Sequence, residues 1–259
     1  MNYIKKINKK NYLDKEEIIK SIYKIRSLLF PNYFEIEDNF NMEKEIKECL
    51  LPQIRNAFMI KKEKFDESIF DTFLIKIDEI IPVLKTDIEA FIEGDPAATD
   101  ENEIILTYPG FFAILFYRVS HILYSLNVPY IPRIICEHVH QKTGIDIHPG
   151  AVIGKYFFID HGTGIVIGQT SSIGDHVRLY HGVTLGALSL ARGRHLQGIK
   201  RHPTIGNNVI IYSDASLLGG DTIIGDNVTI GSNAFITKSI DANSIVRFSS
   251  CALEIIKKA

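Results

Sequence analysis

The stretch IDIHPGAVIGKYFFIDHGTGIVIG (residues 145–168) carries an aliphatic residue every six positions. Glycine repeatedly follows that residue and suits tight corners because it has no Cβ. A period of six is typical of a hexapeptide β-helix, in which three short strands form a triangle and every sixth side chain points inward. Two series show this spacing: Ile147, Ile153, Ile159 and Ile165, then Ile167, Ile173, Leu179 and Leu185.

The repeat continues toward the C-terminus after one interruption. Residues 187–200 break the period and carry Arg192, Arg194, His195 and Lys200, which predicts a loop extruded from the coil. The spacing resumes at Ile205 and Ile211 and slips by one residue at Gly219 and Gly220. The inward series after the slip is predicted to be Leu218, Ile224, Ile230 and Ile236.

Residues 14 to about 144 follow a different, helical spacing, as in Ile18, Ile22 and Ile25. We expect helices from Asp14 as N-cap, over about 42–60 and 65–91, from Pro109 to about 126, and from Pro132 to Gly144 as C-cap. The predicted class is α+β: an N-terminal helical bundle (1–144), a left-handed parallel β-helix (145–245) and a short tail (246–259).

Composition narrows the classes of function. The 29 basic residues against 31 acidic ones give a formal net charge of −2, which argues against nucleic acid or an anionic membrane as partner. The three cysteines form no CxxC pair, which favours a reducing cytosol. Residues 110–126 are the most apolar, but Arg118, Ser120 and His121 interrupt them, so we expect a core helix or subunit contact in a cytoplasmic protein without membrane spans.

His161 is the strongest candidate for chemistry. It lies in the sequence DHGTG (160–164), where the six-residue register slips by two, beside the acidic Asp160. Acyl transfer to an alcohol needs a base near the hydroxyl, and histidine suits that role. Asp146, fifteen residues earlier, is close to one turn of the coil away and could orient the ring. An alternative is a metal site between subunits made by His148, His161 and His181.

The combination of several short motifs resembles the serine acetyltransferase family. The motifs are Asp146-Ile147-His148-Pro149, Ile159-Asp160-His161 with 164–168, Gly182-Val183-Thr184-Leu185-Gly186 and Lys200-Arg201-His202-Pro203. The helical half adds Asp87-Ile88-Glu89-Ala90, Asp95-Pro96, Gly110-Phe111 and Tyr117-Arg118.

The resemblance implies a cytoplasmic enzyme of cysteine biosynthesis that moves acetyl from acetyl-CoA to L-serine, without a metal. His161 would be the general base and Asp146 its orienting partner, with His202 also in the catalytic site. Serine would be held by Asp95, Asp160, Arg201 and His202. Acetyl-CoA would contact Gly186, Ala187, Ser213, Ala215, Gly231 and Lys238. We expect a homotrimer with sites between subunits, and the helices could pair trimers.

The sequence also departs from that family. Gln169 stands where a glutamate is usual, the loop before Arg201 is long, and Val246-Arg247-Phe248-Ser249 replaces a Gly-Val-Pro-Ala turn. The chain ends in Lys257-Lys258-Ala259 rather than isoleucine, which predicts a weak or absent complex with O-acetylserine sulfhydrylase. Two other functions stay open: an acetyltransferase for homoserine or a sugar hydroxyl, and a metal-dependent or non-enzymatic β-helix protein.

Overall fold

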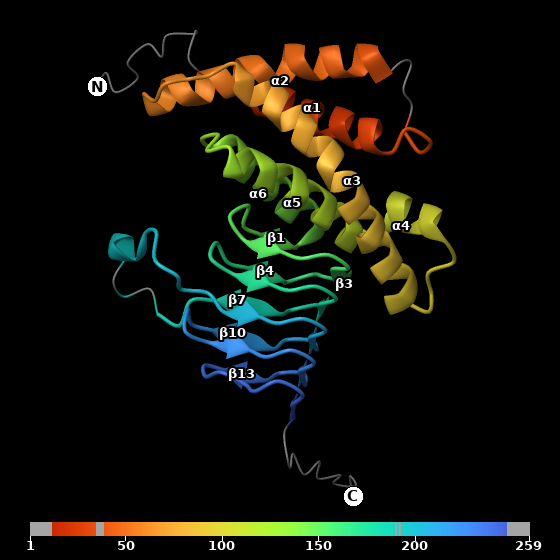
Figure 1. The fold of residues 1–259 in the computed structure, drawn as a ribbon, viewed down its shortest axis with the longest axis vertical. Helices are drawn as coiled ribbons and strands as arrows, with labels where there is room; N and C mark the ends of the chain where they lie inside the picture. Colours follow the sequence, from red (N-terminus) through yellow and green to blue (C-terminus); the bar gives the residue numbers. More distant parts are fainter. Residues whose placement is uncertain (1–11, 35–38, 190, 192, 248–259) are drawn as a thin grey trace, which may run out of the picture.

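The computed structural model describes residues 12–34, 39–189, 191 and 193–247. Six helices come first and a coil of short parallel strands follows (Figure 1). The helices are α1 (Lys15–Leu29), α2 (Asn39–Lys61), α3 (Ser68–Gly94), α4 (Glu101–Thr107), α5 (Pro109–Ser125) and α6 (Ile131–Thr143). Arg192 and residues 248–259, including the predicted tail contact, lie outside the described residues.

The helix ends follow local chemistry. The carboxylate of Asp14 accepts hydrogen bonds from the backbone N–H groups of Glu16 and Glu17 and so caps α1. Pro109 opens α5 at its first position, and Gly144 ends α6 with φ +72°. The sequence reading missed α4, a short helix capped by Asp100.

The fourteen strands form a parallel β-helix with three faces, which confirms the predicted fold class. Face 1 contains β1 (Asp146–Ile147), β4 (Val166–Ile167), β7 (Thr184–Gly186), β10 (Ser216–Leu218) and β13 (Phe235–Ile236). Face 2 contains β2 (Val152–Ile153), β5 (Ser172–Ile173), β8 (Thr204–Ile205) and β11 (Ile223–Ile224). Face 3 contains β3 (Phe158–Asp160), β6 (Arg178–Tyr180), β9 (Ile210–Ile211), β12 (Thr229–Ile230) and β14 (Ile245–Val246).

The inward series is the predicted one except at one residue. Leu217 is fully buried in the coil, whereas Leu218, which we expected inside, is only partly buried. Leu217 stands six residues after Ile211, so the period holds through β10 and the extra residue falls after it, in the corner at Gly219 and Gly220. The prediction of Leu218 was therefore wrong by one residue.

A buried ion pair joins the helices to the first turn of the coil. Arg118 of α5 donates to both carboxylate oxygens of Asp87 of α3, at 2.6 and 2.8 Å. The same guanidinium donates to the carbonyl oxygens of Ile153 and Gly154 in the coil, and Phe157 N–H donates to Asp87. Asp87 and Arg118 thus have a structural role: they hold α3 and α5 against the first turn of the coil.

The break in the repeat is a loop that leaves the coil between β7 and β8 and carries the one-turn 3₁₀ helix η1 (Gly193–Leu196), as predicted (Figure 1). No single described helix combines the length and the apolarity needed to cross a bilayer; α4 and α5 together have both but meet at a bend of 73°. Most of α5 is buried in the core, so its apolar character is explained by packing.

Candidate active site

Two corners of the coil, on either side of face 1, hold the predicted site residues. We call the turn between face 3 and face 1 the histidine corner; it comprises residues 161–165, 181–183, 212–215 and 231–234. We call the turn between face 1 and face 2 the loop corner; it comprises residues 148–151, 168–171, 187–203, 219–222 and 237–239.

His161 is pushed out of the coil by a local insertion. The histidine corner has five residues between β3 and β4 but only three between β6 and β7, so this turn carries two extra residues. The side chain of His161 is 77% exposed and its backbone has φ +56°, a region that costs roughly 1–2 kcal/mol for a residue with a Cβ. The predicted register slip is thus a real distortion, and it presents an accessible imidazole.

Two carboxylates face this imidazole. The Nε2 atom of His161 lies 3.7 Å from an oxygen of Asp160. Asp95, at the end of α3, also faces His161, and its pKa is lowered chiefly by hydrogen bonds from Tyr108 and from Ala97 N–H, with a smaller contribution from His161. The fold therefore gathers three of the predicted residues, Asp95, Asp160 and His161, in one cluster.

Asp146 does not join that cluster within one chain. Its carboxylate lies 3.6 Å from Nη1 of Arg133 on α6, and no hydrogen bond or ion pair connects it to His161 among the described residues. Glu137 and His140 lie close enough to form a three-ligand metal group with Asp146, but Arg133 already pairs with both carboxylates. The ring-orienting role of Asp146 stays a prediction.

At the loop corner a single threonine holds the Arg201–His202 pair. The Oγ1 atom of Thr170 accepts hydrogen bonds from the backbone N–H of Arg201 at 2.9 Å and of His202 at 3.1 Å. The same oxygen lies 2.8 Å from Nδ1 of His202, and Thr170 N–H donates to Nδ1 at 3.0 Å. Because a backbone N–H can only donate, Nδ1 is the acceptor, and the neutral ring of His202 carries its proton on Nε2.

His202 is buried and stays neutral. Burial, helped by the charges of Arg201 and Lys200, lowers the pKa of its imidazole to about 4. Its solvent exposure is only 7%, which agrees with burial as the main cause. A neutral ring whose Nδ1 is already bonded cannot take a proton readily, so His202 offers one donor, the Nε2–H group.

Arg201 is oriented by an amide rather than by a carboxylate. Its Nη2 donates to Oε1 of Gln169 at 2.6 Å, and Nε2 of Gln169 donates to the hydroxyl of Tyr124 on α5. A neutral partner fixes the guanidinium without cancelling its charge. The full positive charge of Arg201 therefore remains for an anionic ligand.

The residues expected to contact acetyl-CoA divide between the two corners. Ser213, Ala215 and Gly231 lie at the histidine corner, whereas Gly186, Ala187 and Lys238 lie at or beside the loop corner. A groove of about 420 Å³ opens at the loop corner and is lined by three cations. They are Lys200, Arg201 and Lys238.

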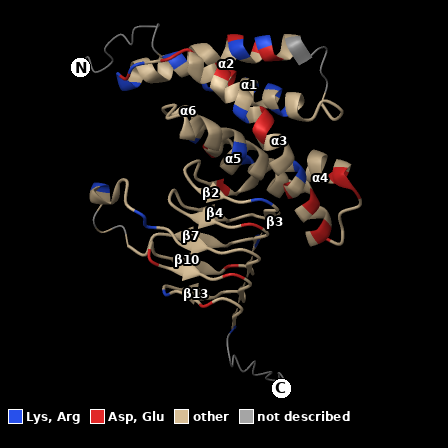
Figure 2. Cartoon of the chain, viewed as in Figure 1, with Lys and Arg blue, Asp and Glu red and all other residues tan. Residues whose placement is uncertain are grey.

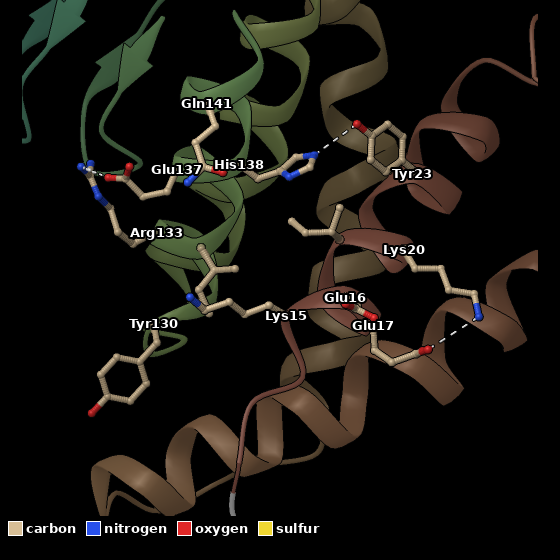
Figure 3. Close-up of a pocket in the computed structure, with 12 residues that line it drawn as sticks. Lys15, Glu16, Glu17, Lys20, Tyr23, Tyr130, Arg133, Glu137, His138 and Gln141 are labelled. Atoms are coloured by element: carbon tan, nitrogen blue, oxygen red, sulfur yellow. Dashed lines mark hydrogen bonds and ion pairs between the residues drawn. The ribbon is translucent and has the colours of Figure 1, made fainter. Parts of the chain in front are cut away.

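A larger hollow of about 910 Å³ lies between α1 and α6, away from both corners (Figure 3). Its polar side chains largely satisfy one another: Lys20 pairs with Glu17, and the hydroxyl of Tyr23 lies 3.2 Å from Nε2 of His138. It lacks the predicted site residues, so we place the candidate site at the two corners.

Comparison with known proteins decides the family. The model "Serine acetyltransferase, N-terminal" matches residues 32–115, and "Bacterial transferase hexapeptide (six repeats)" matches residues 202–238. The serine acetyltransferase of Helicobacter pylori is 44% identical over 161 residues, which is 62% of this chain and 90% of that one. The chain belongs to the serine acetyltransferase family. The expected resemblance is thereby confirmed, and the chain is an acyltransferase of this family.

Other members agree in sequence and in structure. A plasmid serine acetyltransferase of Synechococcus elongatus is 50% identical over 177 residues, covering 67% of this chain but only 55% of that protein. Serine acetyltransferase isoform 3 of Entamoeba histolytica, solved with cysteine, superposes with a TM-score of 0.82 at 38% identity over 92% of this chain and 84% of that one.

Two more distant family members were solved with other ligands. The serine acetyltransferase of Neisseria gonorrhoeae, in complex with serine, has a TM-score of 0.64 at 26% identity over 92% of this chain and 83% of that one. The enzyme of Brucella abortus, in complex with coenzyme A, has a TM-score of 0.64 at 27% identity over 91% and 80%.

Sequence reasoning missed three residues of the site. Tyr108 was not singled out, although it precedes the Pro109 that opens α5. Thr170 and Gly168 flank the noted Gln169 but belong to a corner whose partner residues are more than thirty positions away. One signal in the sequence could have found Gly168 and Thr170: the polar pair Gln169-Thr170 follows an Ile-Gly corner, one turn before the interruption of the repeat.

Proposed function

We propose that this chain transfers the acetyl group of acetyl-CoA to the hydroxyl of L-serine, giving O-acetylserine and CoA. One observation carries the proposal: an accessible imidazole with two carboxylates at one corner of the coil, and an arginine held by a neutral amide beside a neutral histidine at the other. Family members that were solved with serine and with coenzyme A support the two substrates.

His161 is the general base. Its imidazole takes the proton of the serine hydroxyl as that oxygen attacks the thioester carbonyl carbon, and a tetrahedral intermediate forms. Collapse of the intermediate breaks the C–S bond, and the imidazolium returns its proton to the departing thiolate. The outward position of His161 supports this role because two molecules must meet at the ring.

Charge complementarity assigns the two ends of serine. The carboxylates of Asp95 and Asp160 suit the ammonium group, and Arg201 with the Nε2–H of His202 suits the carboxylate. His202 thus acts as a donor that binds substrate rather than as a second base, because its Nδ1 is occupied and its pKa is about 4.

The separation of the two corners supports a site shared between subunits. One face of the coil, six residues long, spans roughly 15–20 Å, more than one serine can bridge. Acidic residues of α4 and of the end of α3 lie on the opposite flank of the molecule from the extruded loop with its basic residues (Figure 2). In a homotrimer the loop corner of one subunit would meet the histidine corner of the next, and pairing of trimers through the helices is compatible with this.

The same arrangement explains why the residues expected to contact acetyl-CoA lie at two different corners of one chain. Ser213, Ala215 and Gly231 of one subunit would line one wall of the groove, and Gly186, Ala187 and Lys238 of the next would line the other. Lys200 and Lys238 of the loop-corner groove suit the phosphates of CoA, since Arg201 is assigned to serine. Asp146 would complete the site by orienting His161, once assembly of the trimer has released its carboxylate from Arg133.

Acceptor screening tests the activity. Purified protein is mixed with acetyl-CoA and each of L-serine, O-phosphoserine, L-homoserine and a sugar, and thiol release is followed; metal content is measured on the same sample. We expect release with L-serine above all. Faster thiol release with homoserine or a sugar would show that this acceptor, and not serine, is the substrate. No thiol release with any acceptor would refute the acetyltransferase assignment.

Mixing two inactive variants tests the shared site. An equal mixture of H161A and R201A chains, refolded or co-expressed, forms mostly mixed trimers in which one of three sites has both functional halves. Recovery of about a quarter of the wild-type activity is expected. If each site lay within one chain, the mixture would stay as inactive as its components.

The proposed function also bears on location in the cell and on binding to a partner enzyme. The three cysteines without a CxxC pair, and the substrates acetyl-CoA and serine, suit an enzyme of the reducing cytoplasm. Weak or absent binding to O-acetylserine sulfhydrylase stays a prediction, and calorimetry against that enzyme tests it. Calorimetry that detected a tight complex, abolished by deleting residues 254–259, would contradict this.

A further inference from the structure

Tyr108 makes a short hydrogen bond to the carboxylate of Asp95, one of the three residues in the cluster that includes His161. Its hydroxyl donates to Oδ2 of Asp95 at 2.7 Å, while the backbone N–H of Ala97 donates to Oδ1 at 2.8 Å. Both carboxylate oxygens are therefore held, one by a turn of the backbone and one by a side chain from the junction of α4 and α5. Each oxygen keeps lone pairs for a further donor.

The ring that carries this hydroxyl is fixed independently of it. Tyr108 packs edge-on against Phe91 of α3, with ring centroids 5.8 Å apart and an interplanar angle of 88°. Phe91 is fully buried and contacts Phe158 of β3 in the same way. The phenol therefore reaches Asp95 from a rigid platform, and removal of the oxygen alone leaves the packing in place.

The groups around Asp95 explain why this hydrogen bond matters. His161 faces Asp95 from the coil, whereas Glu103 of α4 lies near enough for Asp95 to oppose its ionisation. The hydroxyl of Tyr108 is the largest influence on the carboxyl of Asp95 and lowers its pKa. In turn Asp95 raises the pKa of Tyr108 to about 12, so the phenol keeps its proton and remains a donor.

We propose that Tyr108 is a positioning residue for the acceptor amino acid: its hydroxyl holds the carboxylate of Asp95 ionised and oriented to receive the ammonium group. The inference rests on the proposed function in that Asp95 binds the acceptor. Tyr108 itself touches neither substrate. It sets the selectivity for an acceptor that carries an ammonium group next to its hydroxyl.

The test is Tyr108→Phe, with Tyr33→Phe as the matched control. The hydroxyl of Tyr33 also donates to a carboxylate, Glu101, but at an exposed position outside the cluster. For Y108F we expect about a tenfold rise in the KM for L-serine, with kcat and the KM for acetyl-CoA nearly unchanged. Y33F should match the wild type in all three.

Two readouts separate positioning from a general structural role. Without the hydrogen bond the pKa of Asp95 rises, so the loss of L-serine binding on acidification, followed by calorimetry rather than by turnover, should begin at higher pH in Y108F. The preference for L-serine over 3-hydroxypropionate, which is serine without its amino group, should fall in Y108F. An unchanged pH dependence and preference, or an equal rise in both KM values, overturns the inference.

Binding of L-serine, measured by calorimetry, keeps this test separate from the activity. Wild-type protein that binds serine but transfers no acetyl refutes the proposed function, while weaker binding by Y108F than by Y33F still supports the role of Tyr108. Equal binding by the two variants overturns that role. Wild-type protein that does not bind serine refutes both.

Discussion

Gly168 lies directly against the imidazole of His202: a Cβ built on Gly168 would come 2.0 Å from Cδ2 and 2.1 Å from Nε2 of the ring. The glycine is required by this close approach and not by its backbone, since it is not among the residues with positive φ. The missing side chain of Gly168, on the preceding turn, thus leaves the space that the ring of His202 occupies.

Gly168→Ala should therefore displace His202 and weaken serine binding. We expect at least a tenfold rise in the KM for serine and a loss of roughly 1–3 kcal/mol in stability, the usual cost of overpacking. Steady-state kinetics and urea unfolding measure the two effects. Gly193→Ala is the control for the KM for serine only: that glycine has no atom within 4 Å of its Cβ position, but its φ of +49° strains any residue with a Cβ, so its stability is not compared. Similar serine KM values for the two variants would contradict the proposed contact.

His161→Ala should lower turnover by at least ~100-fold, the scale of lost general-base assistance, with acetyl-CoA binding preserved. Asp146→Asn should cost less, since that carboxylate would orient the ring rather than take the proton. Rapid-mixing assays for kcat and calorimetry with CoA provide the measurements. Turnover close to wild type in H161A would remove this residue from the role of base.

Arg201→Lys keeps the charge but loses the planar fork that Gln169 orients at 2.6 Å. We expect the KM for serine to rise more than the KM for acetyl-CoA, because an ammonium cannot form the paired contacts with a carboxylate. Gln169→Glu offers a second check: a carboxylate beside Arg201 would neutralise it, and serine binding should weaken in the same direction. A serine KM unaffected by both changes would place Arg201 outside the serine site.

Stability should fall on mild acidification. The pKa values of His148 and His202 are both lowered to about 4 by burial, against about 6.5 in an unfolded chain. Between these values the unfolded state binds more protons, so the free energy of unfolding should be highest above pH ~6.5 and decline toward pH ~4. Urea titrations across this range test it. His148→Asn should flatten the decline, and an identical pH dependence in that variant would show that His148 does not contribute.

The sequence by itself determined the coil and pointed to several candidate site residues. The period of six placed the inward residues because each turn buries the same position, and it failed only at Leu218: Leu217 points inward instead, because the extra residue follows β10 rather than preceding it. The slip at residues 160–164 identified His161 for the same reason: a break in a strict period marks a distortion, here with φ +56°.

Tertiary structure decided which of these residues act together. Asp95 and Tyr108 belong to different helix ends, and they come near the histidine corner because the buried Asp87–Arg118 pair and the Phe91–Phe158 contact dock those helices on the first turn of the coil. Thr170 and Gly168 gain their roles from residues over thirty positions later, brought near by one turn of the coil around an extruded loop. A periodic sequence fixes which way each side chain points, but contacts between turns and helices depend on long-range packing that no local pattern records.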